Sequence, residues 1–296
     1  MISVGIPLRF SILFLCALAL REPLHANDNP LDDAIALFNG HRVPEARALL
    51  APLVESEPNN TQALWYLGKA DILMQRREEA AGILQRAVKL SPQDHRILAD
   101  YGTASLLCAT DFGFSLKSIG YARQGKNALL EAVRLAPDVI AYREGLVAFY
   151  KQAPAIVGGS VDKAYAQAEE IAKRDPIRGT VIKASILASE KKYAEARAVC
   201  EESLRIQPDS YMALYTLGRI ASESGQELAR GEQALRRCLE LTPAIQEPDF
   251  AGVHYRLGMI AEKSGHPDTA RTEYQRALTL EPTFQAAASA LKNLDK

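Results

Sequence analysis

The sequence has few of the residues that build disulfide frameworks or metal centres. Among its 296 residues are only four cysteines and five histidines. Cys108, Cys200 and Cys238 are widely separated and show no Cys-x-x-Cys spacing, so neither a disulfide framework nor a zinc site is predicted. Cys200 and Cys238 fall at apolar positions of predicted helices, where we expect buried free thiols. Four histidines also lack metal-ligand spacing and are expected to be surface or structural side chains: His41, His95, His254 and His266.

The chain also lacks an excess of charge of either sign. It contains 35 Lys and Arg against 36 Asp and Glu, a formal net charge of −1. Proteins that bind nucleic acid or anionic membranes usually carry a basic excess, so no nucleic-acid partner is predicted. The apolar fraction of 48% is that of a folded globular chain.

Catalytic motifs are missing as well. The Gly158-Gly159-Ser160 turn has neither the GxxxxGK[ST] spacing of a phosphate-binding loop nor the GxSxG spacing of a nucleophile elbow. Ser160 is instead placed to cap a helix that begins directly after it, with Asp162 in the first turn. No other part of the sequence shows the spacing of a catalytic nucleophile and base or of a set of metal ligands. We therefore predict that the protein is not an enzyme and carries no cofactor or metal.

The one long apolar run extends from Phe10 to Leu20. It follows Arg9 and is shorter than the about 20 residues that span a bilayer, a pattern typical of a secretory signal peptide. We predict a signal peptide over residues 1–26, cleaved after Ala26, and a periplasmic or secreted location. No membrane span is expected in the remaining chain. An uncleaved anchor or a buried helix is the alternative.

Helical repeats dominate the rest of the sequence. The stretch from Leu64 to Pro92 has a Leu-Gly pair, small residues at fixed offsets and a closing proline, and the stretch from His254 to Pro282 repeats them. Small residues let two antiparallel helices approach closely, and proline ends the second helix. This pattern resembles the tetratricopeptide repeat, a helix-turn-helix unit of about 34 residues.

Closing prolines divide the chain into seven units that end near Pro58, Pro92, Pro137, Pro176, Pro208, Pro243 and Pro282. The resemblance implies an all-α fold. It would be a right-handed superhelical solenoid of about seven units over residues 27–282, followed by a capping helix over residues 283–296. The turn containing Pro154, Gly158, Gly159, Ser160 and Ala164 is similar to one in exported bacterial envelope members of this family. That similarity implies an exported repeat protein and no activity.

Two units are longer than the repeat period. One carries about eleven extra residues between Leu106 and Lys126, and the next about five around residues 151–163. Insertions in such proteins map to the helix connections and often to one functional face. Two interpretations stay open, namely longer helices with a longer turn, or loops that contact a ligand.

Family members bind partners on a concave face lined by the first helix of each unit. Mapped by position, the groove candidates are Trp65, Lys69, Arg96, Glu144, Lys183, Tyr215, Arg219 and Tyr255. Aromatic rings and long cations suit a peptide, because stacking and charge-assisted hydrogen bonds hold an extended chain. The alternative for each residue is packing between helices or exposure on a solvated surface.

The predicted function is therefore an exported scaffold that binds a protein or peptide partner in the groove. A second hypothesis is an accessory ligand-binding component of a transport or envelope-assembly system. Its anionic ligand would lie near Gly158, Gly159 and Ser160, because a free helix N-terminus attracts anions. The identity of the partner and the oligomeric state are not predicted.

Overall fold

The described part of the chain is helical throughout. The computed structural model describes residues 29–113, 115–244 and 247–294, which form fifteen α-helices and one 3-10 helix and contain no strand. The helices are α1 (Pro30–Asn39), α2 (Val43–Ser56), α3 (Thr61–Leu73), α4 (Arg77–Leu90), α5 (His95–Asp111), α6 (Leu116–Leu135), α7 (Ile140–Gln152), η1 (Ala155–Val157), α8 (Val161–Ala172), α9 (Pro176–Ser189), α10 (Tyr193–Ile206), α11 (Tyr211–Ser224), α12 (Leu228–Cys238), α13 (Phe250–Lys263), α14 (Pro267–Leu280) and α15 (Gln285–Leu294). The predicted signal peptide lies outside the described residues.

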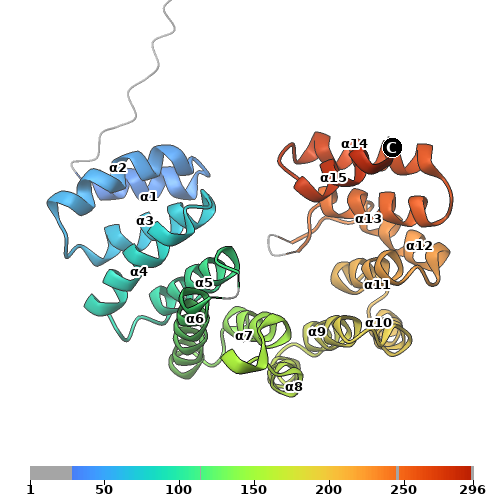
Figure 1. The fold of residues 1–296 in the computed structure, drawn as a ribbon, viewed down its shortest axis with the longest axis horizontal. Helices are drawn as coiled ribbons and strands as arrows, with labels where there is room; N and C mark the ends of the chain where they lie inside the picture. Colours follow the sequence, from blue (N-terminus) through green and yellow to red (C-terminus); the bar gives the residue numbers. More distant parts are fainter. Residues whose placement is uncertain (1–28, 114, 245–246, 295–296) are drawn as a thin grey trace, which may run out of the picture.

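The helices form an open arc whose two ends are the first and last helix pairs (Figure 1). Through the middle of the arc, α3, α5, α7, α9 and α11 form an inner row, while α4, α6, α8 and α10 lie outside them (Figure 1). Each helix packs mainly on its neighbours in sequence, as expected for stacked helix pairs. The predicted all-α repeat solenoid is confirmed.

Close contact between the two helices of a unit depends on glycine. In three units a glycine of the first helix faces a large buried side chain of the second: Gly68 with Leu84, Gly218 with Leu235, and Gly258 with Tyr274. A Cβ at these glycines would lie 2.2 to 2.4 Å from an atom of the partner side chain. The Leu-Gly pairs of the sequence therefore mark the points where helix axes approach most closely.

The insertion between Leu106 and Lys126 is built as longer helices. Helices α5 and α6 have 17 and 20 residues, whereas α3 and α4 have 13 and 14. The added turns are tied to the start of α4 by an ion pair between Lys117 Nζ and Glu78 Oε1 at 2.6 Å. Of the two interpretations of this insertion, the structure supports longer helices. The second insertion forms the connection between α7 and α8, including η1.

Two of the closing prolines do not end a helix as predicted. Pro176 is the first residue of α9, and α8 ends earlier, at Ala172. Proline suits this first position because its missing N–H has no intrahelical partner there. Pro243 lies within a long connection between Cys238 and Phe250, which the sequence interpretation missed.

Replacing Gly218 by alanine tests the close approach of paired helices. The new methyl group would overlap Leu235, and overpacking of this kind costs about 1 to 3 kcal/mol. The matched control is Gly82→Ala in α4, where no atom lies within 4 Å of the added Cβ. We expect Gly218→Ala to lower the midpoint of thermal unfolding, measured by circular dichroism. Gly82→Ala should raise it, because alanine favours helix by up to about 1 kcal/mol. Equal shifts in the two variants would contradict this account of packing.

Candidate binding groove

Direct bonds between successive inner helices identify side chains of the inner face. Trp65 Nε1 in α3 donates to Asp100 Oδ2 in α5 at 2.6 Å. Lys151 Nζ in α7 donates to Ser185 Oγ in α9 at 2.8 Å. Each bond joins two inner helices that are separated in the sequence by one outer helix. These four residues therefore lie where the inner helices meet, on the inner side of the arc.

An aromatic–cation cluster occupies the inner face of the N-terminal half. It consists of Phe38, Trp65, Tyr66, Lys69 and Arg96. The ammonium of Lys69 lies 4.9 Å from the ring centroids of Phe38 and Trp65 and 5.1 Å from that of Tyr66. The guanidinium of Arg96 lies 4.7 Å from the Trp65 ring. The structure thus brings three of the groove candidates together, and ring faces stabilise both cations.

Asp100 holds the tryptophan of this cluster in place. Burial raises the pKa of Asp100, and the hydrogen bond from Trp65 and the charge of Lys69 act against that rise. The indole is half-buried and packs on the hydrophobic cores of both neighbouring units. Trp65 therefore packs between helices and still presents part of its surface.

A second group of charges, the cationic cluster, lies on the inner face of the C-terminal half. It consists of Lys151, Arg219 and Arg256. Arg219 Nη1 lies 3.5 Å from both carboxylate oxygens of Glu223, and Arg256 Nη1 lies 3.2 Å from Glu223 Oε1. Glu223 on α11 therefore joins cations from two inner helices. Of this group, the sequence interpretation identified only Arg219.

The two tyrosines predicted for this half are partly enclosed. The ring centroid of Tyr255 lies 5.1 Å from that of Phe284 and 5.9 Å from that of Tyr274. Tyr255 therefore packs between α13, α14 and the chain that leads into α15. Tyr215 is half-buried against the core of its own half, and a Cβ at Gly252 would lie 3.2 Å from its hydroxyl.

The remaining two groove candidates lie on α7 and α9. Glu144 accepts hydrogen bonds from Arg178 Nε at 2.6 Å and Nη2 at 2.8 Å, a bidentate pair across the inner row. Lys183 is exposed and lies five residues after Arg178 and two before Ser185, so it occupies a different side of α9. The structure does not bring Lys183 together with these residues.

A pocket of about 460 Å³ lies where the two long units meet. Its lining includes Leu107 of α5, Ile119 of α6, Ala148 and Phe149 of α7 and Val157 of η1. We call it the inter-unit pocket. Inner helices α5 and α7 both contribute to its lining, so it lies beside the inner row. Both insertions therefore contribute to one site.

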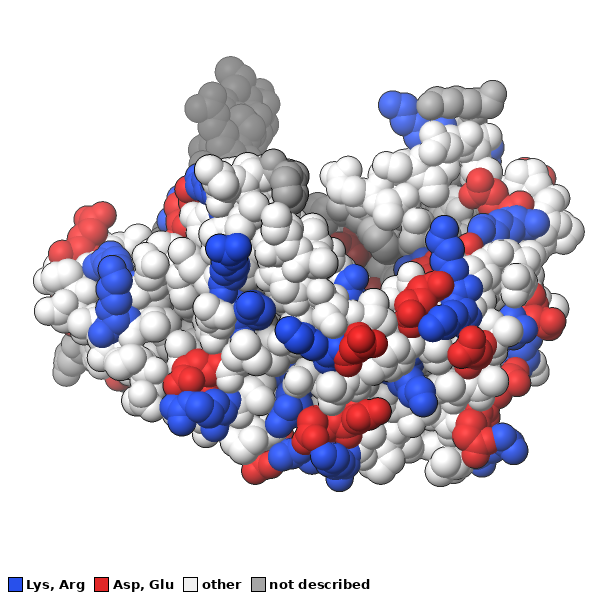
Figure 2. Space-filling view, turned by 60° about the horizontal axis from the view of Figure 1, so that its bottom comes forward, with Lys and Arg blue, Asp and Glu red and all other residues white. Residues whose placement is uncertain are grey.

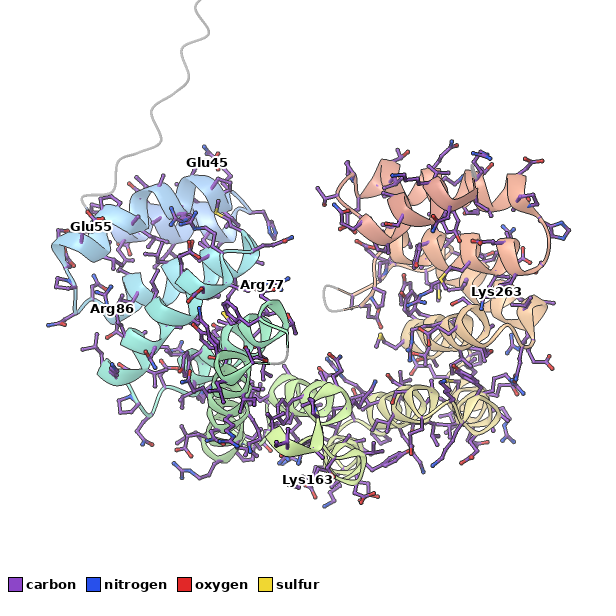
Figure 3. All side chains as sticks on the ribbon, in the orientation of Figure 1. Glu45, Glu55, Arg77, Arg86, Lys163 and Lys263 are labelled. Atoms are coloured by element: carbon purple, nitrogen blue, oxygen red, sulfur yellow. The ribbon has the colours of Figure 1, made fainter. Side chains whose placement is uncertain are left out.

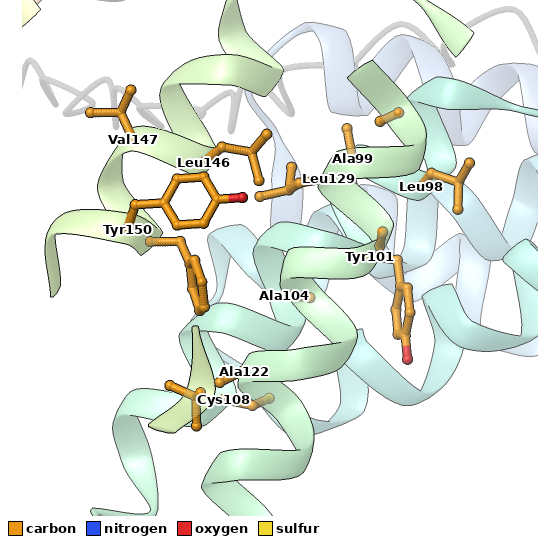
Figure 4. Close-up of a cluster of buried hydrophobic side chains, with 14 of the residues drawn as sticks. Leu98, Ala99, Tyr101, Ala104, Cys108, Ala122, Leu129, Leu146, Val147 and Tyr150 are labelled. Atoms are coloured by element: carbon orange, nitrogen blue, oxygen red, sulfur yellow. The ribbon is translucent and has the colours of Figure 1, made fainter. Parts of the chain in front are cut away.

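Buried apolar residues and exposed apolar side chains both adjoin the inter-unit pocket. Behind it lies a buried cluster that includes Leu129, Leu146 and Tyr150 (Figure 4). Leu116 and Ile156, each next to lining segments in the sequence, are 89% and 64% exposed. Exposed apolar side chains beside a preformed apolar pocket are typical of a surface that binds another protein.

The Gly158-Gly159 turn is required by backbone geometry. Gly158 has a φ of +102°, a region that side chains rarely adopt. A Cβ at Gly159 would lie 1.7 Å from the carbonyl oxygen of Ala153. The two glycines therefore let the chain fold tightly from α7 into α8.

Ser160 caps the N-terminus of α8, as predicted. Its hydroxyl accepts a hydrogen bond from the amide of Lys163 at 3.3 Å, and its own amide donates to the carbonyl of Tyr150 at 2.9 Å. The amides of both glycines donate to carbonyls of the same turn. Lys163 lies on outer helix α8, and its ammonium lies 5.8 Å from the ring centroid of Tyr150 (Figure 3). The anionic-ligand hypothesis for this turn gains no support from these bonds and stays a prediction.

The other reactive side chains have structural partners. Cys200 and Cys238 are fully buried, which confirms the expected buried thiols, and burial raises the pKa of each to about 12. His95 Nδ1 lies 2.7 Å from Tyr142 Oη, and His254 Nδ1 lies 2.6 Å from Glu273 Oε2. Within residues 29–113, 115–244 and 247–294, no group of three His, Cys, Asp or Glu is arranged to hold a metal. None of the helices in these ranges is long and apolar enough to cross a membrane.

Three tetratricopeptide repeat family models match the sequence, over residues 31–95, 181–210 and 251–284. These matches agree with the stacked helix pairs and the glycine contacts described above. The chain contains tetratricopeptide repeats over these residues. Both long units lie mainly between the first and second matches, so the inter-unit pocket belongs to the irregular part of this repeat array. No curated protein sequence matches the chain.

Solved structures share the fold at low sequence identity. A tetratricopeptide repeat protein from Parabacteroides merdae superposes with a TM-score of 0.66 and 13% identity, covering 90% of this chain and 98% of that one. A human IFIT1 dimer with m7Gppp-AAAA superposes with a TM-score of 0.58 and 17% identity, covering 90% of this chain and 61% of that one. The Cut9–Hcn1 hetero-tetramer of the APC/C superposes with a TM-score of 0.53 and 15% identity, covering 93% of this chain and 50% of that one. These likenesses show the fold alone.

Proposed function

We propose that this tetratricopeptide repeat protein is a non-catalytic scaffold that holds a segment of another protein along its inner face. The inter-unit pocket carries the proposal, because two separate insertions build one apolar pocket beside the inner helices. An apolar side chain of the partner would fill this pocket. The aromatic–cation cluster and the cationic cluster would contact the segment on either side.

The physical argument is preorganisation. A few apolar anchors in well-packed pockets supply most of the binding free energy of an interface. The walls of the inter-unit pocket belong to packed helices, so little conformational entropy is lost when it binds. The exposed Leu116 and Ile156 add apolar surface near this site.

Export is a further part of the proposal. It rests on the apolar run from Phe10 to Leu20 and on the similarity of the Gly158-Gly159-Ser160 turn to envelope members of the family. The partner would then be another exported or envelope protein.

Filling the inter-unit pocket should weaken capture of the partner about tenfold. Ala148 is exposed at the wall of the pocket, so Ala148→Trp should occupy it without disturbing the core. The matched control is Ala198→Trp, at an exposed alanine on outer helix α10. Affinity capture from extracts of the source cells, quantified by mass spectrometry, should show a protein that wild type and Ala198→Trp retain. Ala148→Trp should retain about tenfold less.

Thermal unfolding of both variants serves as the folding control. Undiminished capture by a folded Ala148→Trp protein would show that the inter-unit pocket is not the binding site.

The N-terminus of the chain isolated from its source tests export. We expect it to begin at Asn27 and to be found in the envelope or secreted fraction, because a signal peptidase would cut after Ala26. N-terminal sequencing that finds Met1 on cytosolic protein would exclude this location.

A further inference from the structure

The inner helices of the C-terminal half carry an excess of positive charge. Helices α7, α9, α11 and α13 contain seven Lys and Arg against three Glu and no Asp. The helices that pair with them, α8, α10, α12 and α14, contain eight Lys and Arg against nine Asp and Glu. Positive and negative side chains are interspersed on the outer side of the arc (Figure 2). The first helices of these four units therefore carry a formal net charge of +4, seven positive against three negative residues, in a chain that is nearly neutral as a whole.

In the cationic cluster, positive side chains outnumber the carboxylates that contact them. Arg219 and Arg256 pair with the single carboxylate of Glu223, whose negative charge also acts on Lys151. The contacts of Arg219 with that carboxylate, at 3.5 Å, are at the limit of hydrogen-bonding distance. The side chains of Arg219 and Arg256 are only 20% and 19% exposed. Three largely enclosed cations are therefore compensated by one anion.

The polar contacts of the cluster leave donors unused. The ammonium of Lys151 donates to a hydroxyl, that of Ser185, and makes no ion pair within the described residues. Arg256 Nε is buried and has no hydrogen-bond partner there. Burial lowers the pKa of Lys151, and the charge of Arg219 lowers it further against the opposing effect of Glu223. An anion placed among these groups would relieve both the desolvation and the repulsion.

We infer that Lys151, Arg219 and Arg256 form an anion site for a Glu or Asp side chain of the bound segment, an inference that rests on the proposed scaffold function. The three residues lie on α7, α11 and α13, so the site extends along the groove. We assign its ligand as a side-chain carboxylate of a segment that follows the groove.

The inter-unit pocket and this anion site are adjacent on α7. Ala148 lines the pocket, and Lys151 follows it by three residues, on the next turn of the same helix. Gln152, another pocket residue, is next to Lys151 in the sequence. Successive helical turns are about 5.4 Å apart, which an extended chain spans in about two residues. The recognised segment thus has an apolar anchor with acidic residues a few positions away.

A blocked acidic peptide tests the anion site directly. The probe is hexaglutamate with an acetylated N-terminus and an amidated C-terminus, so that it carries side-chain carboxylates alone. Binding is measured by calorimetry at low ionic strength, with blocked hexaglutamine and inorganic phosphate as comparison ligands. We expect hexaglutamate to bind and hexaglutamine not to bind, and affinity should fall as salt is added.

Substitutions in the cationic cluster then test whether hexaglutamate binds there. Lys151→Gln and Arg219→Gln should each weaken the affinity for hexaglutamate about tenfold. Lys163→Gln, which removes a lysine from outer helix α8, should leave it unchanged (Figure 3). Equal affinities of folded Lys151→Gln, Arg219→Gln and Lys163→Gln proteins would overturn the inference. So would absence of hexaglutamate binding, or tighter binding of phosphate than of hexaglutamate.

The pocket variant separates this inference from the scaffold proposal. Ala148→Trp should still bind hexaglutamate, because the probe has no apolar anchor. If the cluster variants lose the probe while Ala148→Trp still captures the cellular partner, the anion site stands and the pocket proposal fails. If Ala148→Trp loses the partner while Lys151→Gln binds the probe as wild type does, the anion site alone is refuted.

Discussion

The structure depends on the close approach of two helices at a glycine. Where Gly68 faces Leu84 and Gly218 faces Leu235, the leucine side chain leaves no room for a Cβ on the glycine. This contact makes each pair a compact unit with one remaining apolar side, which it buries by stacking on the next pair. Stacking in one direction places every first helix in the same row. The inner face, and every binding site on it, is a consequence of that arrangement.

The functional features arise where the regular pattern is interrupted. Added turns in α5 and α6 and the tight turn at Gly158 and Gly159 change how α5 and α7 meet, and the inter-unit pocket lies between them. The cationic cluster follows directly on α7, so an apolar and a charged element act on neighbouring parts of the same ligand. Neither element requires a reactive group, which agrees with a scaffold.

Much of the architecture could be predicted because it depends on local signals. The Leu-Gly pairs located the helix contacts, Ser160 was recognised as a helix cap, and Cys200 and Cys238 as buried thiols. Trp65 and Lys69 lie in a unit of regular period, and Arg96 lies ahead of the insertion in its unit, so the positional offsets apply to all three residues that the structure brings together. Lys151, Arg178 and Arg256 were missed, and Lys183 was placed with the groove residues. Lys151 lies at the edge of an insertion, where the positional offsets no longer fix which side of a helix faces inward. Nothing in the sequence showed that two insertions meet in one pocket, because that contact depends on the stacking of whole units.

The most direct test of the account is a map of the surface that the partner covers. Carbene footprinting of the protein alone and with its captured partner measures which side chains lose solvent contact. The account predicts reduced labelling on α5, α7, α9 and α11, including Ala148 and Lys151, and unchanged labelling on outer helices α8 and α10. Protection confined to the outer helices, with the inner face labelled equally in both states, would contradict it.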